Sequence, residues 1–494
     1  MEASAQNDKK DQGIPVPDAT AGGGKEPRKK PKSSILKRLV KWIVIPVFCL
    51  AILWTLVAVI WNWSSSEKLN KKLDELRRRG EPLSAHDIQE HYEKLLSGIE
   101  RNGAHLYLAA FEAIKNDRNN KEWESLPVID GKVPPPGAKL SPETDGKVQD
   151  FLEKHKWFFE VVELAQQCKG CMFPRQYTDG AEMCLPELAS IRSAVRIVLL
   201  KCYWAACRDD FDTAVGAIEA AFRLAKDLDD DWTLIARLVQ VAVTHVSISQ
   251  LEHLLSAGAI SADQLARLER VVPEGLDMDS YTMSLIAERG AMGLWAFDEV
   301  LGGNATVNSL CGNGETEFSS CLWWIVPSGL LKDQCIRYLD FMTTMIDFTK
   351  LPPTEARARI HKDFQVFVEE RRQGGAIAAV ENFVLDLLLP ALHSCYDKYV
   401  AGSQRLALAR AAVTLERFRA EKGSLPETLD ELVPAFMDKV PEDHFAQGKI
   451  RFLKDAKGYT VWSVGCDGVD NKGARDTSNN DGRDGFDIVV RIER

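Results

Sequence analysis

The sequence predicts a mainly α-helical protein with an N-terminal transmembrane helix and a small C-terminal α/β domain. Residues 42–63 form an uncharged apolar segment, apolar residues recur at helical spacing from about residue 84 to residue 421, and short strand-like segments follow Gly423. We therefore expect four parts: a disordered cytoplasmic tail (1–34), a transmembrane anchor (35–66), an extracytoplasmic all-α domain of helical hairpins packed as a bundle or solenoid (67–400), and an α/β domain (401–494).

The composition is that of a folded protein rather than a disordered chain or a polytopic membrane protein. Of the 494 residues, 45% are hydrophobic and 27% are charged, which is ordinary for globular domains. The net charge of −10 argues against a nucleic-acid binder, because nucleic acid is itself a polyanion. We expect no nucleic-acid partner, and the sequence identifies no small-molecule substrate.

The apolar segment over residues 42–63 is long enough to cross a membrane. At about 1.5 Å per residue it spans roughly 33 Å, and the hydrocarbon core of a bilayer is about 30 Å thick. Trp42 lies at one end of the segment and Trp61 and Trp63 lie at the other, where tryptophan favours the membrane interface. We predict that this segment contacts the lipid bilayer.

The basic residues around the apolar segment predict its orientation. Residues 25–41 hold eight Lys or Arg, whereas residues 64–80 hold six. Because the more basic flank stays in the cytoplasm, we expect a single-pass protein of the inner cell membrane with a cytoplasmic N-terminus and most of the chain outside the cytoplasm. A cleaved signal peptide is the alternative, since three serines at residues 64–66 resemble a cleavage site.

The clearest helical hairpin of the middle domain covers residues 187–228. Its second helix has one apolar stripe, formed by Ala214, Ile218, Ala221, Phe222 and Ala225. We expect Asp212 to cap this helix. The segment resembles the turn and second helix of a tetratricopeptide repeat, but only about one unit matches and no period of about 34 residues continues. A generic antiparallel hairpin is the alternative interpretation.

Further helices follow from apolar spacing and capping signals. Residues 234–248 are predicted to form a central helix of a soluble bundle rather than a second membrane span, because Arg237 and Gln240 interrupt the apolar run. Ser261 and Gln264 form a capping box that opens another helix. The remaining helices are expected over residues 280–301, 329–350, 353–372 and 377–421, with a loop over residues 304–328.

The C-terminal residues change to a strand pattern and carry a family resemblance. Residues 450–453, 459–464 and 487–492 are expected to be short strands. In this context the sequence resembles the C-terminal half of the major pseudopilin of type II secretion systems. The elements that carry the resemblance are Gly423, Leu425–Pro426, Val440–Pro441, Trp462–Ser463, Gly465, Asp467–Gly468 and Asp487–Ile488.

The resemblance covers roughly 90 residues, and it implies a pseudopilin-like α/β fold with a calcium-binding loop. The apolar segment lies far upstream and lacks the prepilin-peptidase site of the family, and the D-P-F element is changed to Asp443–His444–Phe445. We therefore expect a shared domain fold and no assembly into a pilus. The order of anchor, helical domain and C-terminal region is also similar to single-pass membrane-anchored bacterial proteins, which implies no reaction.

An Asp-rich loop precedes the last predicted strand. Calcium binds about six to eight oxygen ligands from flexible carboxylates and carbonyls, and glycine helps a loop to wrap the ion. By analogy with the pseudopilin loop, Asp467 and Asp487 are the expected ligands of a structural calcium ion, and Asp470 and Asp484 are further candidates. The alternative is a solvated acidic loop, partly neutralised by nearby Lys and Arg side chains.

The cysteines and histidines identify no active site. The chain has eleven cysteines, and Cys168 and Cys171 form a C-x-x-C pattern. Structural disulfides, free buried thiols, a zinc site and a redox pair are the open interpretations. Because we find no P-loop, nucleophile elbow or H-E-x-x-H motif, we expect no catalytic residues, no cofactor-binding residues and no enzyme activity.

These observations predict an interaction or scaffold protein of the cell envelope, with a protein partner on its helical domain. One alternative is an envelope hydrolase whose site lies between helices of the middle domain, and another is an accessory component of a secretion apparatus. A deep pocket with converging carboxylates or histidines of shifted pKa would favour the hydrolase. A concave helical face would favour binding.

Overall fold

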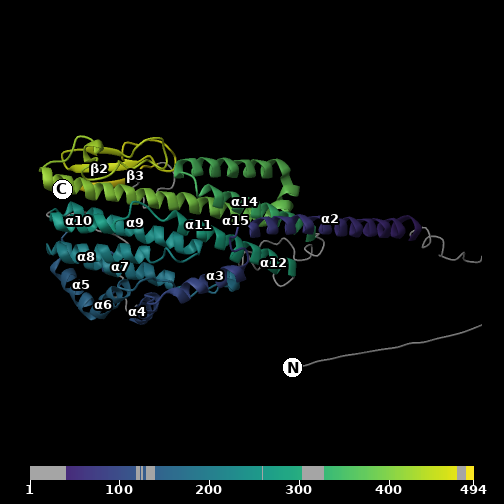
Figure 1. Cartoon of the computed structure of the whole chain (residues 1–494), viewed down its shortest axis with the longest axis horizontal. Helices are drawn as coiled ribbons and strands as arrows, with labels where there is room; N and C mark the ends of the chain where they lie inside the picture. The colour runs from purple at the N-terminus through teal and green to yellow at the C-terminus, as the bar shows by residue number, and fades with distance from the viewer. Residues whose placement is uncertain are drawn as a thin grey trace, which may run out of the picture. The chain divides into compact units, whose positions relative to one another are not determined.

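The computed structural model describes residues 40–117, 123, 126–129, 139–258, 260–302, 328–474 and 486–494, with the backbone alone for residues 40, 371 and 374–391. The predicted tail (1–34) lies outside the described residues. The chain forms two compact units, Met1–Ile60 and Trp61–Arg494. The described residues are mostly helical with one small three-stranded sheet, which confirms that the protein is mainly α-helical (Figure 1).

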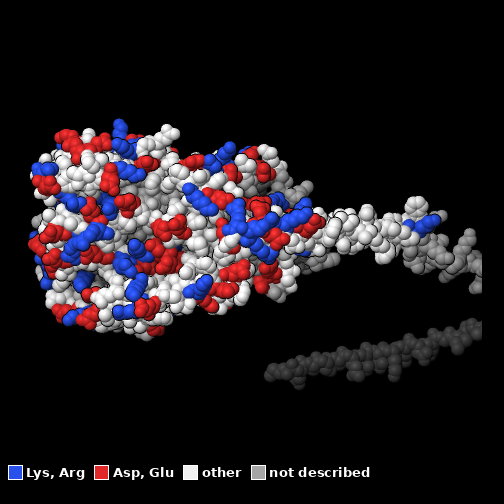
Figure 2. All heavy atoms as spheres, in the orientation of Figure 1, with Lys and Arg blue, Asp and Glu red and all other residues white. Residues whose placement is uncertain are grey.

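The first unit contains the apolar segment. A π-helical turn, η1 (Val40–Val44), leads into α2 (Ile45–Arg78). Large apolar side chains of this segment are exposed, for example Trp42 at 75% and Leu53 at 57%. Figure 2 shows a section of this helix without charged side chains. The helix from Lys41 to Arg78 is long and apolar enough to span a membrane and is therefore a candidate membrane anchor, as predicted.

The later part of α2 belongs to the second unit and packs against α14 (Ser328–Phe348). The indole N–H of Trp61 donates a hydrogen bond of 2.7 Å to Asp333. Lys72 forms an ion pair of 2.7 Å with Asp340, and Leu76 is fully buried. These contacts fix this part of α2 to α14.

Several helices and a buried ion-pair network follow along the chain. Ser84 and Asp87 form a capping box at the start of the first of them. Arg175 is buried and pairs with Glu187 at 2.6 Å and with Asp231, so it ties three distant segments together. The helices of this region are α3 (Ala85–Gly98), α4 (Ala104–Asp117), α5 (Pro142–Lys154) and α6 (Lys156–Gln166).

The predicted hairpin is formed by α7 (Pro186–Cys207) and α8 (Phe211–Lys226). The predicted apolar stripe faces the core, where Ile218 and Ala221 are fully buried. The predicted cap was wrong: Asp210, not Asp212, accepts the hydrogen bond from the Thr213 amide, at 3.1 Å. The helix begins earlier than expected because Asp209 adopts a φ of 59° and turns the chain before Phe211.

The central helix of the second unit is α9 (Leu234–Ser256), which packs against α7, α8 and the long helix α15 (Pro353–Lys422). Most of its apolar surface is buried inside the protein, as the sequence predicted for a core helix. Two of its buried polar side chains are hydrogen-bonded: Gln240 donates to Ala225 O and Asp229, and Arg237 donates to Gln240. The predicted capping box of Ser261 and Gln264 opens α10 (Ala262–Val271).

The helix predicted over residues 280–301 is formed, and it runs without a break from Met278 to Gly302 as three consecutive segments with a π-helical turn in the middle. The π-helical turn η4 in the middle packs closely on its neighbours, since a Cβ at Gly293 would lie 2.1 Å from the Tyr338 hydroxyl. The segments are α11 (Met278–Ala287), η4 (Glu288–Leu294) and α12 (Trp295–Gly302).

The helix α15 folds back on itself. His361 and Asp397 form a hydrogen bond of 3.0 Å, although a straight helix would separate residues 36 positions apart by about 54 Å. Figure 1 shows the ribbon of α15 reversing direction. The reversal places residues from its two arms side by side.

The C-terminal sheet is antiparallel, with the order β1 (Arg451–Lys454), β2 (Gly458–Ser463) and β3 (Ile488–Glu493), close to the predicted strands. The turn between β1 and β2 is held by Asp455, which accepts hydrogen bonds from the amides of Lys457 and Gly458. The sheet lies beside α15 (Figure 1), and the Tyr459 hydroxyl donates to Ala412 O at 3.0 Å.

Candidate functional site

The floor of a surface groove is the second face of α8. The core-facing stripe covers one side of this helix, while a different set of residues recurs at helical spacing on the other side. These residues are mostly small, so neighbouring helices leave an open channel above them. The floor residues are Thr213, Gly216, Ala217, Ala220 and Arg223.

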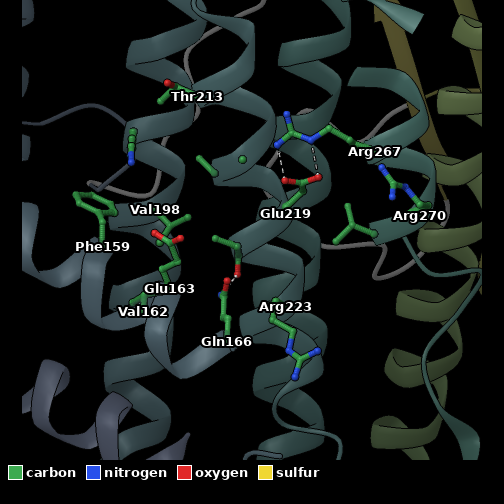
Figure 3. Close-up of a pocket in the computed structure, with 15 residues that line it drawn as sticks. Phe159, Val162, Glu163, Gln166, Val198, Thr213, Glu219, Arg223, Arg267 and Arg270 are labelled. Atoms are coloured by element: carbon green, nitrogen blue, oxygen red, sulfur yellow. Dashed lines mark hydrogen bonds and ion pairs between the residues drawn. The ribbon is translucent and has the colours of Figure 1, made fainter. Parts of the chain in front are cut away.

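Two helices form the walls of the groove, one on each side of α8. Gln166 on α6 donates a hydrogen bond of 2.9 Å to the carbonyl of Ala220 and fixes the first wall. Arg267 on α10 pairs with both carboxylate oxygens of Glu219, at 3.0 and 2.6 Å, and fixes the second wall. Phe159 and Val162 on α6 supply apolar surface facing the channel (Figure 3).

The groove is more basic than the rest of the protein. Its lining holds four cations, Lys201, Arg223, Arg267 and Arg270, and two acids, Glu163 and Glu219. Glu219 forms an ion pair with Arg267, whereas Arg270 has no ion-pair partner among the described residues. The lining therefore holds two more cations than acids, but Arg223 pairs at 2.9 Å with Asp227, which is not a lining residue.

Lys201 is a partly buried cation of the groove. The ammonium group of Lys201 lies 4.6 Å from the centre of the Phe159 ring, and burial lowers the pKa of Lys201. The groove has a volume of about 720 Å³, within the range of ligand-binding pockets. Cations beside apolar side chains suit an anionic ligand that also has apolar groups.

The predicted calcium ligands lie at the end of β2 and the start of β3, with Asp484 outside the described residues. Asp487 accepts hydrogen bonds from the amides of Asn471 and Gly473. Asp470 accepts from the Trp462 indole at 3.0 Å and pairs with Arg451 at 2.9 Å.

The described carboxylates of this loop are near enough to repel each other but do not form a compact set. Burial raises the pKa of Asp487, and the charges of Asp470 and Asp467 add to this increase. Within the described part of the chain, Asp467, Asp470 and Asp487 are not among the side chains whose ligand atoms lie within 4.8 Å of one another. The calcium site therefore remains a prediction.

The nine described cysteines are all free thiols in this structure. The Cys171 and Cys202 thiols are buried, and burial raises the pKa of both well above the usual range. Buried thiols with raised pKa values are poor nucleophiles and poor metal ligands. Of the open interpretations, the structure shows free thiols for the described residues; Cys311 and Cys321 lie outside them.

A cluster of two histidines and one carboxylate lies where α15 folds back. His361 Nε2 is 3.1 and 3.0 Å from the two carboxylate oxygens of Asp397, and the His361 and His393 rings are 4.3 Å apart between centroids. Arg357 donates to Asp397 at 2.9 Å. Although burial opposes it, the hydrogen bond with His361 and the charge of Arg357 lower the pKa of Asp397.

Comparison of the chain with known protein families, curated proteins and solved structures finds no match. The pseudopilin resemblance therefore rests on the C-terminal residues themselves and stays a prediction. Function has to be argued from the geometry of the groove and of the clustered side chains.

Sequence reasoning identified neither the groove nor the histidine cluster. The groove could have been found locally, because Gly216 and Ala220 place two small residues on the side of an amphipathic helix away from its buried stripe. The histidine cluster also could have been inferred from the sequence. The predicted break between the helices over residues 353–372 and 377–421 allows the chain to reverse, and a reversal brings histidines of the two helices together.

Proposed function

We propose that the protein is a membrane-anchored binding protein of the cell envelope that holds an acidic peptide segment of a partner protein in the groove of α6, α7, α8 and α10. The N-terminus lies in the cytoplasm, and the helical domain lies outside it. The observation that carries the proposal is the excess of cations in a groove of about 720 Å³ on an otherwise acidic chain.

The lining of the groove indicates the chemistry of the bound segment. Arg270 provides positive charge beside the channel, whereas Arg223 is already paired with Asp227 at 2.9 Å. Guanidinium groups bind carboxylates with two parallel hydrogen bonds. Phe159, Val162 and Val271 provide apolar surface for side chains between those carboxylates. Figure 3 shows the α6 residues opposite Arg267 and Arg270 across the channel. A segment with alternating acidic and apolar side chains fits this lining.

The C-terminal domain has a supporting role in this proposal. A calcium ion bound by Asp467 and Asp487 would offset the burial and the carboxylate repulsion that together raise the pKa of Asp487, and it would fix the loop before β3. The ion is structural and takes no part in binding the peptide.

A peptide selection on the full chain tests the groove. A phage library of random 12-residue peptides is selected on the protein in lipid nanodiscs, and a labelled winner is titrated by fluorescence polarisation. We expect enrichment of Asp and Glu together with apolar residues. Gly216→Trp should weaken binding at least tenfold, because a side chain there enters the channel and has only the Arg267 side chain near its Cβ, at 3.7 Å.

Charge reversal separates the groove from general electrostatic attraction. Arg270→Glu should weaken the peptide at least tenfold, whereas Arg101→Glu, which changes an exposed arginine outside the groove, should leave the affinity unchanged. The proposal would be contradicted if the selected peptides are not enriched in Asp and Glu. It would also be contradicted if the Gly216→Trp and Arg270→Glu variants bind the peptide as tightly as the unchanged protein.

A further inference from the structure

The cluster at the reversal of α15 contains the side chains of a metal site. His361, His393 and Asp397 each offer one ligand atom, and these atoms all lie within 4.8 Å of one another. Zinc binds histidine nitrogen at about 2.0–2.1 Å in a tetrahedron, so its ligand atoms are roughly 3.3 Å apart. The observed separation of 3.0 Å between His361 Nε2 and Asp397 Oδ2 is close to that value.

One histidine of the cluster has a nitrogen without a protein partner. His393 Nε2 is buried and makes no hydrogen bond. Leaving a buried polar atom unsatisfied costs about 1–3 kcal/mol, so such an atom usually has a ligand or a water. The ring is held in place by Phe364, which stacks on it with centroids 4.6 Å apart. The orientation of His393 is therefore set by packing, and its nitrogen is free to coordinate.

The carboxylate of the cluster is oriented by a neighbouring arginine. Arg357 donates through Nε to Asp397 Oδ1, and its other end donates to the Cys466 carbonyl at 2.7 Å. The Arg357 guanidinium also lies 4.6 Å from the centre of the Phe445 ring. This arrangement leaves Oδ2 of Asp397 for a cation, and hydrogen-bonded carboxylates of this kind are typical around metal ligands.

The kinds of ligand select the metal. Calcium and magnesium need several oxygen ligands, whereas two imidazoles and one carboxylate suit zinc and its neighbours in the first transition row. The His361 side chain is 34% exposed and that of Asp397 is 19% exposed, so solvent reaches the cluster. A water molecule can therefore fill the fourth position.

We infer that His361, His393 and Asp397 bind one zinc ion, with water as the fourth ligand. The ligands come from both arms of α15, so the ion joins the two arms next to the C-terminal domain. On binding, zinc takes the place of the hydrogen bond between His361 Nε2 and the Asp397 carboxylate. The site is separate from the groove, and the inference does not depend on peptide binding.

Zinc titration of the full chain tests the inference. The protein is purified in detergent, stripped with a chelator, and titrated with Zn²⁺ by isothermal calorimetry and against a chromogenic zinc indicator. We expect one site per chain that His393→Gln and His361→Gln each weaken at least a hundredfold. The control His86→Gln changes an exposed histidine elsewhere and should leave the affinity unchanged.

Two further measurements separate this site from the thiols and from misfolding. Cobalt bound in place of zinc should give visible absorption bands of a tetrahedral nitrogen and oxygen site, without the intense charge-transfer band of thiolate ligands. Metal-free variants should keep the circular dichroism spectrum of the unchanged protein and lose only the rise in Tm that zinc produces. The inference would be overturned if all variants bind zinc with equal affinity, or if the cobalt spectrum shows a thiolate band. It would also be overturned if no saturable binding is seen at 10 µM Zn²⁺.

Discussion

At the scale of single residues, Asp443 shows how one buried carboxylate organises the C-terminal domain. Its Oδ1 accepts hydrogen bonds from the Ser463 hydroxyl at 2.7 Å and the Phe445 amide at 3.0 Å. Its Oδ2 accepts from the Val464 amide at 3.2 Å and pairs with Arg451 at 2.6 Å. The carboxylate therefore joins the segment before β1 to the end of β2. It belongs to the Asp–His–Phe sequence that departs from the pseudopilin pattern, and the structure gives this aspartate a structural role.

Replacing Asp443 tests this role. We expect Asp443→Ala to lower the free energy of unfolding by about 3 kcal/mol, because it leaves buried donors and a partly buried arginine without an acceptor. Asp438→Ala removes an exposed carboxylate nearby and should change stability by less than about 0.5 kcal/mol. Urea unfolding followed by tryptophan fluorescence measures both, and equal midpoints for the two variants would show that the Asp443 contacts contribute no net stability.

At the scale of elements, α8 shows what periodicity predicts and what it leaves out. The stripe of Ile218 and Ala221 was predicted as a core face because local spacing determines which side of a helix is apolar. The groove on the other side was not predicted, because its walls come from Phe159 and Arg270 on separate helices. Likewise the strands follow from local alternation, whereas the contact of His361 with Asp397 depends on the reversal of α15.

The start of α8 provides a prediction at the same scale. Asp210→Ala should destabilise the protein by about 1 kcal/mol, because the side chain caps the helix by accepting from the Thr213 amide. Asp212→Ala is the matched control, since among the described residues this exposed aspartate accepts hydrogen bonds from two side chains of α10, Gln264 and Arg267, and we expect a smaller loss of stability. Thermal unfolding of both variants distinguishes the caps, and a larger loss for Asp212→Ala would assign the cap to that residue.

At the scale of the whole molecule, the apolar helix is a candidate membrane anchor. The helix from Lys41 to Arg78 has the length and hydropathy of a membrane span, while α9, which also passes that test, is mostly buried in the second unit. The distinction comes from burial: Leu53 is 57% exposed, whereas Leu251 is 1% exposed. An exposed apolar surface of this length is unfavourable in water. The uncharged sequence and the terminal tryptophans are those expected of a helix buried in a lipid bilayer.

Membrane retention of the full chain tests the anchor and its orientation together. Expressed in a Gram-negative bacterium, the protein should stay in the membrane fraction after carbonate washing at its full mass of 55.2 kDa. Replacing Leu53 and Leu56 with arginine should release it, because each charge at the centre of a span costs about 2.5–3.5 kcal/mol. Leu164→Arg alters an equally exposed leucine of the second unit and should not change retention.

Protease added to spheroplasts then reports the side on which the second unit lies. Digestion of residues beyond the anchor would place them outside the cytoplasm, as the more basic flank before residue 42 predicts, whereas protection would reverse the orientation. A shorter soluble product in the periplasm would instead show cleavage near residues 64–66. Such cleavage would also divide α2 close to Trp61, whose indole N–H donates a hydrogen bond to Asp333 on α14. A stable released product would therefore show that the second unit folds without this contact to α14.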